Sequence, residues 1–358
     1  MSDSYDILII GGGIAGLSLA AELAPHASVC LLEREPHLAY HASGRSAAMY
    51  IGDYGNDIVR ALNHASEASH HAGGILSPKP MLMLGRAEDE GRFDVEAAGL
   101  GLSRVPLAEA QPFFPLLDPA VITRTAMRHD TYAMDTDLMV QNARRAALKG
   151  GVVIKTGAEV VALQHCGLWQ VTAGDRTFTA KTLVNAAGAW TDEIASLAGV
   201  RPLGIQPYRR SMAVLPLPEG LDTSGWAFVD AAGERWYAKA QAGKLLVSPS
   251  EADPMPPMDA WADDMVLAEG LARFEEMVTL EVTRLEHSWA GLRSFAPDHA
   301  LVIGRAPSHP DFLWLAGQGG YGFQTAPAAA RLAADLLLGR TPELPAEVVS
   351  ALSPARFG

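Results

Sequence analysis

The stretch YDILIIGGGIAGLSLAAELAPHASVCLLE, residues 5–33, decides the fold. It opens with a mostly apolar run rich in isoleucine, residues 5–10, which predicts a buried strand. Three glycines follow, and residues 14–24, rich in Ala and Leu, predict a helix that Pro25 ends. Residues 28–32 predict a second buried strand. Strand, glycine turn, helix and strand in this order predict one βαβ unit.

The glycines have the spacing of a dinucleotide-binding fingerprint. Gly11 would make the tight turn, Gly13 would let the backbone approach a pyrophosphate, and Gly16 would let helix and strand pack closely. The N–H groups at the helix start would hold the phosphates. Glu33 ends the second strand about 20 residues further on, where an acid binds the ribose hydroxyls and repels a 2′-phosphate. The stretch therefore predicts a dinucleotide site that disfavours NADP.

The segment after the second strand separates two classes of dinucleotide. In an NAD-dependent dehydrogenase the chain should continue there with a further helix and strand. Here Glu33, Arg34 and Glu35 are followed by a loop of mostly small residues, namely Ser43, Gly44, Arg45, Ser46, Ala47 and Ala48. Such a loop favours backbone N–H groups lying along a longer cofactor that extends past the pyrophosphate. The cofactor that we predict is FAD.

The chain has 358 residues, which is more than one hydrophobic core usually holds. A helix over 138–149, capped by Asp135, and strands at 152–154 and 159–163 return to the first region after an irregular stretch. The remaining predicted elements are strands at 212–215, 236–238, 245–247 and 313–316, a turn at 317–322 and a helix at 326–338. We expect an α/β fold, α+β overall, in which a Rossmann-like FAD-binding domain is interrupted twice by a substrate-binding domain. The expected boundaries are 1–45, 136–205 and 291–358 for the first domain, and 46–135 and 206–290 for the second.

Composition excludes several functions. The formal net charge of −13 repels phosphate backbones, so no nucleic-acid partner is expected. Two distant cysteines, Cys30 and Cys166, make no disulfide framework and fit a reducing compartment. No apolar run is long enough for a transmembrane segment, and the apolar N-terminus lacks the basic region of a signal peptide. We expect a cytoplasmic protein without a metal site; peripheral membrane association stays open.

Six blocks in order resemble the D-amino-acid oxidase-like flavoenzyme family, and most closely the bacterial FAD-dependent D-arginine dehydrogenases. They are IIGGGIAGLSLA (9–20), ASGRSAAMY (42–50), LVNAAGAW (183–190), VRPLGIQPYRRS (200–211), HSWAGLRSF (287–295) and AGQGGYGFQT (316–325). The resemblance runs nearly end to end and implies a substrate domain built on an antiparallel sheet. It implies hydride transfer from a substrate Cα–H to flavin N5, which gives an imino acid that hydrolyses to a 2-oxo acid and ammonia. Since Cys30 is expected in a buried strand and Cys166 just after another, we expect the FAD to be non-covalent.

The fingerprint and the resemblance together imply a set of cofactor-binding residues. The helix near Thr325 would direct its positive end at the flavin and stabilise the reduced anion. The full set is Gly11, Gly13, Ile14, Ala15, Gly16, Glu33, Arg34, Ser43, Gly44, Arg45, Ser46, Ala47, Ala48, Val160, Ala187, Gly188, Trp190, Gly319, Gly320, Tyr321, Gly322, Phe323, Gln324 and Thr325.

The resemblance also implies a site for a small-molecule amino acid. Arg210 and Arg293 match the carboxylate clamps of the family, and arginine suits this role through its bidentate fork. Arg209 would point the other way if this segment is a strand. Tyr54 and Tyr237 match pocket positions and could bond the carboxylate or cover the substrate; Gly320 completes the catalytic set. No dedicated general base is expected.

Two methionines depart from the D-arginine dehydrogenase pattern. That family carries an acid where this chain has Met81, and a histidine where it has Met49. A guanidinium buried against methionine would be costly, so the sequence predicts that D-arginine and D-lysine are poor substrates. A pocket of Met49, Met81 and Met83 is apolar and adaptable. It favours hydrophobic D-amino acids such as D-Leu, D-Met and D-Phe, or bulky secondary amines.

Several alternatives remain open at this point. A secondary-amine enzyme of glycine, sarcosine or D-proline type would share every cofactor residue. A 2-hydroxy-acid enzyme needs a base, for which His41 and His287 are candidates. A tRNA-modifying flavoprotein is disfavoured by the net charge of −13, and a non-catalytic flavin-binding protein by the paired arginines. We expect a dehydrogenase that uses a quinone or another acceptor; an oxidase stays open, since oxygen access depends on packing around Ala48 and Met49.

Overall fold

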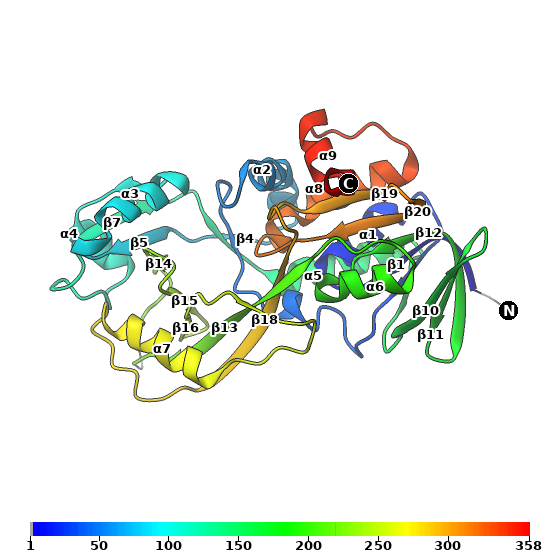
Figure 1. Cartoon of the computed structure of the whole chain (residues 1–358). Helices are drawn as coiled ribbons and strands as arrows, with labels where there is room; N and C mark the ends of the chain where they lie inside the picture. The colour runs from blue at the N-terminus through cyan, green and yellow to red at the C-terminus, as the bar shows by residue number, and fades with distance from the viewer. Residues whose placement is uncertain (1–2, 219) are drawn as a thin grey trace.

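The computed structural model describes residues 3–218 and 220–358 and is shown in Figure 1. Within these residues the strands form three sheets, which have eight, nine and three strands. The strands are β1 (Asp3–Ile10), β2 (Val29–Leu32), β3 (Met49–Tyr50), β4 (Leu76–Pro78), β5 (Met81–Gly85), β6 (Ser103–Arg104), β7 (Arg124–Arg128), β8 (Tyr132–Met134), β9 (Val153–Lys155), β10 (Val160–His165), β11 (Trp169–Ala173), β12 (Arg176–Asn185), β13 (Gln206–Pro216), β14 (Phe228–Ala231), β15 (Tyr237–Gln241), β16 (Lys244–Ser248), β17 (Asp253–Pro254), β18 (His287–Phe295), β19 (Val302–Ala306) and β20 (His309–Ala316). The helices are α1 (Ile14–Leu23), α2 (Asp57–Ala72), α3 (Glu90–Gly99), α4 (Leu107–Ala110), α5 (Thr136–Lys149), α6 (Thr191–Leu197), α7 (Asp264–Glu275), α8 (Gly322–Leu338) and α9 (Ala346–Leu352).

The predicted βαβ unit is confirmed. β1 and β2 pair in parallel, with α1 between them in sequence. Gly11 has φ +112°, and a Cβ there would overlap the carbonyl of Ala186. A Cβ on Gly16 would overlap the carbonyl of Gly11, so this glycine allows the close approach of helix to strand that its position predicted.

The eight-stranded sheet is covered on both faces. Successive side chains of β1 point to opposite sides: Ile7 and Ile9 belong to a core shared with α1, α5 and α8, whereas Leu8 and Ile10 belong to a core shared with α6. β1 also pairs in parallel with β12, and β12 pairs with β20. This sheet and its helices occupy the right of Figure 1. No helix in the described part of the chain is long and apolar enough to cross a membrane.

The nine-stranded sheet lies on the left of Figure 1 and is mostly antiparallel. Its longest pair is β13 with β18, in which Arg210 lies opposite Gly291 and Tyr208 opposite Arg293. β14 is central: it pairs antiparallel with β15 and parallel with β5. These pairings bring distant segments of the chain onto one surface, which lines one end of the cavity described below.

Two elements bear on the predicted domain boundaries, which stay a prediction. α2, from the segment assigned to the substrate domain, packs against α8 in the core of the eight-stranded sheet. β18 runs through position 291, where the sequence analysis placed a boundary, and belongs throughout to the nine-stranded sheet.

α2 was not predicted from the sequence, and α8 begins earlier than predicted. Asn56 caps α2 by accepting a hydrogen bond from the N–H of Val59, but the buried face of α2 includes Asn63, Ser66 and His70, which weakens its apolar pattern. α8 begins at Gly322 rather than at 326, with Pro327 inside the helix. The earlier start brings the N-terminus of α8 close to the glycines of the preceding turn.

Candidate active site

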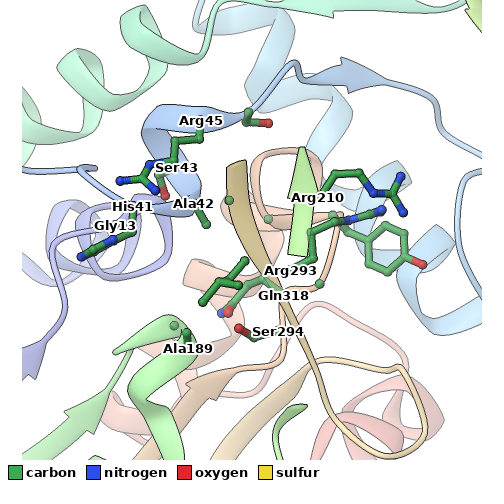
Figure 2. Close-up of a pocket in the computed structure, with 18 of the residues that line it drawn as sticks. Gly13, His41, Ala42, Ser43, Arg45, Ala189, Arg210, Arg293, Ser294 and Gln318 are labelled. Atoms are coloured by element: carbon green, nitrogen blue, oxygen red, sulfur yellow. The ribbon is translucent and has the colours of Figure 1, made fainter. Parts of the chain in front are cut away.

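A cavity of about 1030 Å³ opens between the two large sheets, which is at the upper end of the range for ligand sites. One part is lined by the glycine turn after β1 and the end of β2, and another by β13, β14, β15 and β18. Figure 2 shows Gly13, His41 and Ser43 on one side of this cavity and Arg210 and Arg293 on the other. A cofactor and a small substrate can therefore share it.

Glu33 stands at the end of β2, as predicted, and is 8% exposed. Its Oε2 accepts a hydrogen bond from the N–H of Gly12 at 2.7 Å, and its Oε1 accepts one from the N–H of Glu35 at 2.8 Å. Each carboxylate oxygen keeps a further lone pair. The group is thereby fixed on the cavity wall with acceptors left for ribose hydroxyls.

The loop of small residues folds back over the glycine turn. The hydroxyl of Ser43 accepts a hydrogen bond from the N–H of Ile14 at 3.0 Å, and a Cβ on Gly13 would lie 3.2 Å from it. The guanidinium of Arg45 binds the carboxylate of Asp259 and the carbonyls of Ala260 and Ala290. The loop is thus anchored on both sides, and the residues present fit a dinucleotide lying along the backbone.

Most predicted cofactor residues line this cavity. Three do not: Gly16 packs α1 against β1, Gly44 lies under the loop with its Cβ position against the carbonyl of Ala39, and Thr325 is buried inside α8. The Thr325 hydroxyl donates to the carbonyl of Tyr321 at 2.9 Å. Gly44 and Thr325 thus lie behind the cavity wall, and their cofactor-binding roles stay predictions. Neither Cys30 nor Cys166 is on the wall. The lining residues from the prediction are Gly11, Gly13, Ile14, Ala15, Glu33, Arg34, Ser43, Arg45, Ser46, Ala47, Ala48, Val160, Ala187, Gly188, Trp190, Gly319, Gly320, Tyr321, Gly322, Phe323 and Gln324.

The backbone of the turn before α8 lies directly against Arg293 and Phe295. A Cβ on Gly320 would overlap the guanidinium of Arg293, and a Cβ on Gly319 would overlap the ring of Phe295. Directly after this turn α8 begins, and its first residues line the cavity. The positive end of the helix therefore faces the cavity, where it favours an anion.

Arg293 lies at the centre of a cluster of tyrosines. Its Nη2 donates to the hydroxyl of Tyr54 at 3.0 Å, and the rings of Tyr54 and Tyr321 are 5.1 Å apart. Burial alone would lower the pKa of Arg293, but the hydroxyls of Tyr54 and Tyr237 hold it above its usual value. Burial raises the pKa of Tyr321 to about 12. At neutral pH the site therefore presents the Arg293 cation beside the neutral hydroxyl of Tyr321.

Arg210 is the second predicted clamp and lines the same cavity. Its Nε donates to the carbonyl of Glu251 at 2.7 Å, and its guanidinium lies 5.8 Å from the ring centre of Tyr237. Among residues 3–218 and 220–358, neither Arg210 nor Arg293 forms an ion pair with an acid. Arg209, by contrast, binds Asp253 at 2.8 Å, although it lines the same cavity as well.

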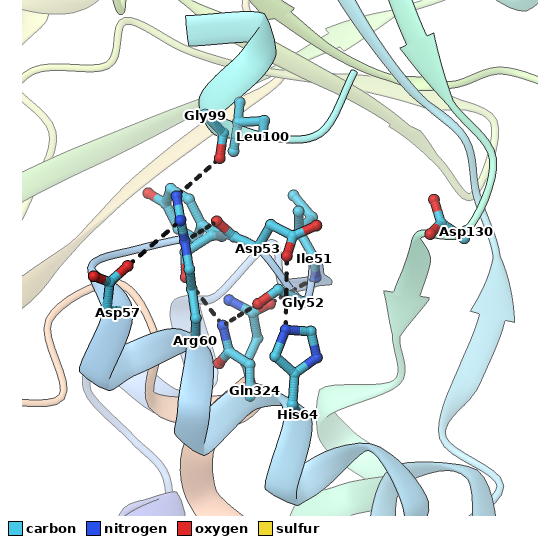
Figure 3. A network of polar contacts seen from close by, with 12 residues as sticks. Ile51, Gly52, Asp53, Asp57, Arg60, His64, Gly99, Leu100, Asp130 and Gln324 are labelled. Atoms are coloured by element: carbon cyan, nitrogen blue, oxygen red, sulfur yellow. Dashed lines mark hydrogen bonds and ion pairs between the residues drawn. The ribbon is translucent and has the colours of Figure 1, made fainter. Parts of the chain in front are cut away.

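A polar network fixes the loop that carries Tyr54 (Figure 3). The N–H of Ile51 donates to Oε1 of Gln324 in α8 at 2.6 Å. Arg60 of α2 donates to the carbonyls of Asp53 and Gly99, at 2.8 and 2.9 Å. The loop is therefore tied to α2, α3 and α8 at once, which holds the tyrosine against Arg293.

Met49, Met81 and Met83 line the cavity and are 8%, 1% and 1% exposed, respectively. They pack in one cluster with Ile51 and Phe93, so they also form part of a core. The expectation of an apolar pocket is nevertheless wrong in part.

Acidic side chains line the same cavity: Asp230 on β14, Glu96 on α3 and Glu234 in the turn after β14. Sequence reasoning missed them, although Phe228 and Asp230 alternate along β14 as pocket-facing residues should. His299 also lines the cavity and was missed, whereas the candidate base His287 does not line it.

The glycine turn after the first strand, the acid after the second and the cavity that they line fit a dinucleotide-dependent oxidoreductase. Residues 6–336 match the FAD dependent oxidoreductase (DAO) family, and the chain belongs to this family. Its cofactor is FAD. When FAD is bound in this cavity, its adenosine would lie at the end near Glu33, and its flavin ring would lie near the turn before α8.

Relatives agree over nearly the whole chain. Glycine oxidase of Bacillus licheniformis is 23% identical, over 95% of this chain and 94% of its own. The crystal structure of glycine oxidase from Geobacillus kaustophilus is 21% identical with a TM-score of 0.85, over 99% of each chain. That of iminodiacetate oxidase from Chelativorans sp. BNC1 is 22% identical with a TM-score of 0.83, over 97% of this chain and 98% of that one. At these identities the structures show the fold.

Proposed function

We propose that the protein catalyses the FAD-dependent oxidative deamination of D-amino acids. The observation that carries the proposal is the pair Arg210 and Arg293, which line one end of the cavity without an acidic partner among the described residues. Two unpaired guanidinium groups in a cavity favour a carboxylate. The D configuration and the nearer kinship to D-arginine dehydrogenases rest on the sequence blocks.

The residues position the substrate for a simple redox step. The Cα–H bond breaks as a hydride and the amine loses a proton, which gives an imino acid; water then yields the 2-oxo acid and ammonia. FAD, when bound, supplies the acceptor for the two electrons. Arg293 and Arg210 hold the carboxylate, Tyr54 and Tyr237 fix its orientation, and Gly320 admits the guanidinium beside the turn.

A quinone or another acceptor would take the electrons onward in a cytoplasmic enzyme, with oxygen as the alternative acceptor. The methionines suit an aliphatic substrate stem such as that of D-Leu or D-Met. The prediction that D-Arg and D-Lys are poor substrates does not follow from the structure, because Asp230 lies in the same cavity as Met81.

A second candidate is the oxidation of a secondary amine or glycine. It is favoured by the names of the relatives, which are oxidases of glycine and iminodiacetate. The same clamp would hold the carboxylate of such a substrate, so the cavity fits both candidates.

Anaerobic mixing of the holoenzyme with single amino acids tests the proposal through the visible absorption of the flavin. We expect bleaching by D-methionine and D-leucine and little by their L-isomers. Faster bleaching by sarcosine, glycine or D-proline would select the second candidate. If D- and L-isomers bleach equally, the assigned configuration is wrong; if no amine bleaches the flavin, the proposed reaction fails.

A further inference from the structure

Asp230 lies on β14, an inner strand of the nine-stranded sheet, and lines the cavity. β14 lies between β5 and β15, and Asp230 is directly paired with Met83 on one side and Tyr237 on the other. Directly paired residues of neighbouring strands share a face and have adjacent side chains. Met83, Asp230 and Tyr237 therefore form one row, and all three line the cavity.

A second row lies next to the first. Phe228, two residues before Asp230, is paired with Met81 on one side and with Lys239 on the other, and its ring lies 5.5 Å from that of Tyr237. The ammonium of Lys239 is directed away to the carbonyls of Ala47 and Ala48. The carboxylate thus emerges among two methionines and two aromatic rings. An aliphatic chain would fit along these apolar side chains, and a charged end would then meet the acid.

The Asp230 carboxylate has no countercharge in contact. No hydrogen bond or ion pair to this carboxylate occurs in the described part of the chain, and the neighbouring N–H of Ala231 donates to the carbonyl of Trp236 at 3.0 Å. Arg210 acts on it only from farther away, while its own contacts are with the Glu251 carbonyl and the Tyr237 ring. Asp230 is half-buried on the cavity wall, and a partly desolvated carboxylate without a partner is costly, so this position is suited to a cation that arrives with a ligand.

Two further acids strengthen the negative potential. Glu96 and Glu234 line the same cavity. Glu96 accepts a hydrogen bond from the N–H of Gly233 at 2.9 Å, and its one ion-pair partner among the described residues is the exposed Arg92 at 3.6 Å. Burial raises the pKa of Asp230 to about 7, with Glu96 and Glu234 acting in the same direction and Arg210 opposing. A bound cation would remove this penalty.

We propose that Asp230 is a specificity-determining residue that binds the cationic end of the substrate, so that the substrate class is an α-amino acid with an aliphatic stem and a terminal ammonium or guanidinium group. This inference rests on the proposed function for the position of the carboxylate at Arg210 and Arg293. The acid absent from position 81 is thereby replaced by one on the neighbouring strand.

Equilibrium binding of 6-aminohexanoate and hexanoate to the oxidised holoenzyme, read from the flavin spectrum, tests this site without turnover. The first ligand is lysine without its α-amine, and the second also lacks the terminal cation. We expect 6-aminohexanoate to bind at least about tenfold more tightly. Asp230→Asn, which keeps the shape, should abolish this preference; Asp222→Asn, the same change at an exposed site, should leave it intact. Equal binding of the two ligands, binding of neither, or a preference that survives Asp230→Asn would overturn the inference.

Reduction of the flavin by D-lysine and D-norleucine separates this inference from the proposed reaction. We expect D-lysine to be preferred by the wild type and the preference to be lost in Asp230→Asn. If the binding preference holds but neither compound reduces the flavin, the cation site stands and the proposed oxidation fails. If D-norleucine reduces the flavin and Asp230→Asn leaves the D-lysine preference unchanged, the oxidation stands and the cation site fails.

Discussion

At the scale of the residue, Gly320 determines whether Arg293 can stand at the clamp position. Because an added Cβ would overlap the guanidinium, Gly320→Ala must displace Arg293 and break its hydrogen bond to Tyr54. We expect kcat/KM for the best amino acid to fall at least about 100-fold, since small displacements of positioning groups have effects of this size. Steady-state kinetics with the flavin content checked by absorption would measure it.

Gly99→Ala is the matched control for this prediction. Gly99 also lines the cavity, but no heavy atom lies within 4 Å of its Cβ position. Its kinetics should stay within about twofold of the wild type. If Gly320→Ala and Gly99→Ala lower kcat/KM by similar factors, the effect of Gly320→Ala is not due to displacement of Arg293.

At the scale of the element, α2 holds the loop of Tyr54 in place through Arg60. Arg60→Met removes the hydrogen bonds to the carbonyls of Asp53 and Gly99. We expect the free energy of unfolding to fall by about 1–3 kcal/mol and KM to rise, because Tyr54 is no longer fixed against Arg293. Urea unfolding and steady-state kinetics would measure the two effects.

The exposed Arg284 provides the comparison, since its contact is a surface ion pair with Glu286 at 3.4 Å. Arg284→Met should change neither quantity beyond the small range typical of surface pairs. An Arg60→Met variant as stable and as active as Arg284→Met would mean that the network in Figure 3 does not hold the loop.

At the scale of the whole molecule, Lys239 joins the nine-stranded sheet to the loop of the cofactor end. Its Nζ donates to the carbonyls of Ala47 and Ala48, at 3.3 and 3.2 Å, and the side chain is 4% exposed. Burial lowers its pKa from 10.5 to about 8, and Lys79 contributes in the same direction. The unfolded chain therefore binds more protons between pH 8 and 10.5, so stability should rise with pH over this interval.

Lys239→Met should reduce this rise, to which Lys239 contributes at most about 3 kcal/mol, and leave the part due to Lys79, whose pKa burial also lowers. Urea unfolding of the holoenzyme at pH 7.5 and 9.5 would compare the two proteins. Tyr50 and Tyr321, whose pKa values burial raises, lose their favourable effect on stability only above about pH 10. Parallel pH profiles for wild type and variant would contradict the assignment to Lys239.

Removal of FAD tests whether the cofactor holds the two large sheets together, because the cavity lies between them. A ligand that binds only the folded state stabilises it by about 4 kcal/mol at 1,000 times its Kd. The apoprotein should therefore melt at a lower temperature than the holoenzyme, and added FAD should restore the transition. Identical melting temperatures, with FAD binding confirmed by its spectrum, would show that the cofactor does not join the two parts.

The sequence by itself determined the dinucleotide turn, because Gly11, Gly13, Gly16 and Glu33 act within one local βαβ unit whose geometry follows from their spacing. The resemblance of six blocks added the arginine clamp, and the structure brings Arg210, Arg293 and both tyrosines to one cavity. Only the tertiary structure decided the character of the substrate end. Asp230 and Met81 are far apart in sequence, and it is the pairing of β14 with β5 and β15 that places an acid beside the methionines. Strand pairing joins residues that are far apart in the sequence, so a local sequence pattern does not predict it.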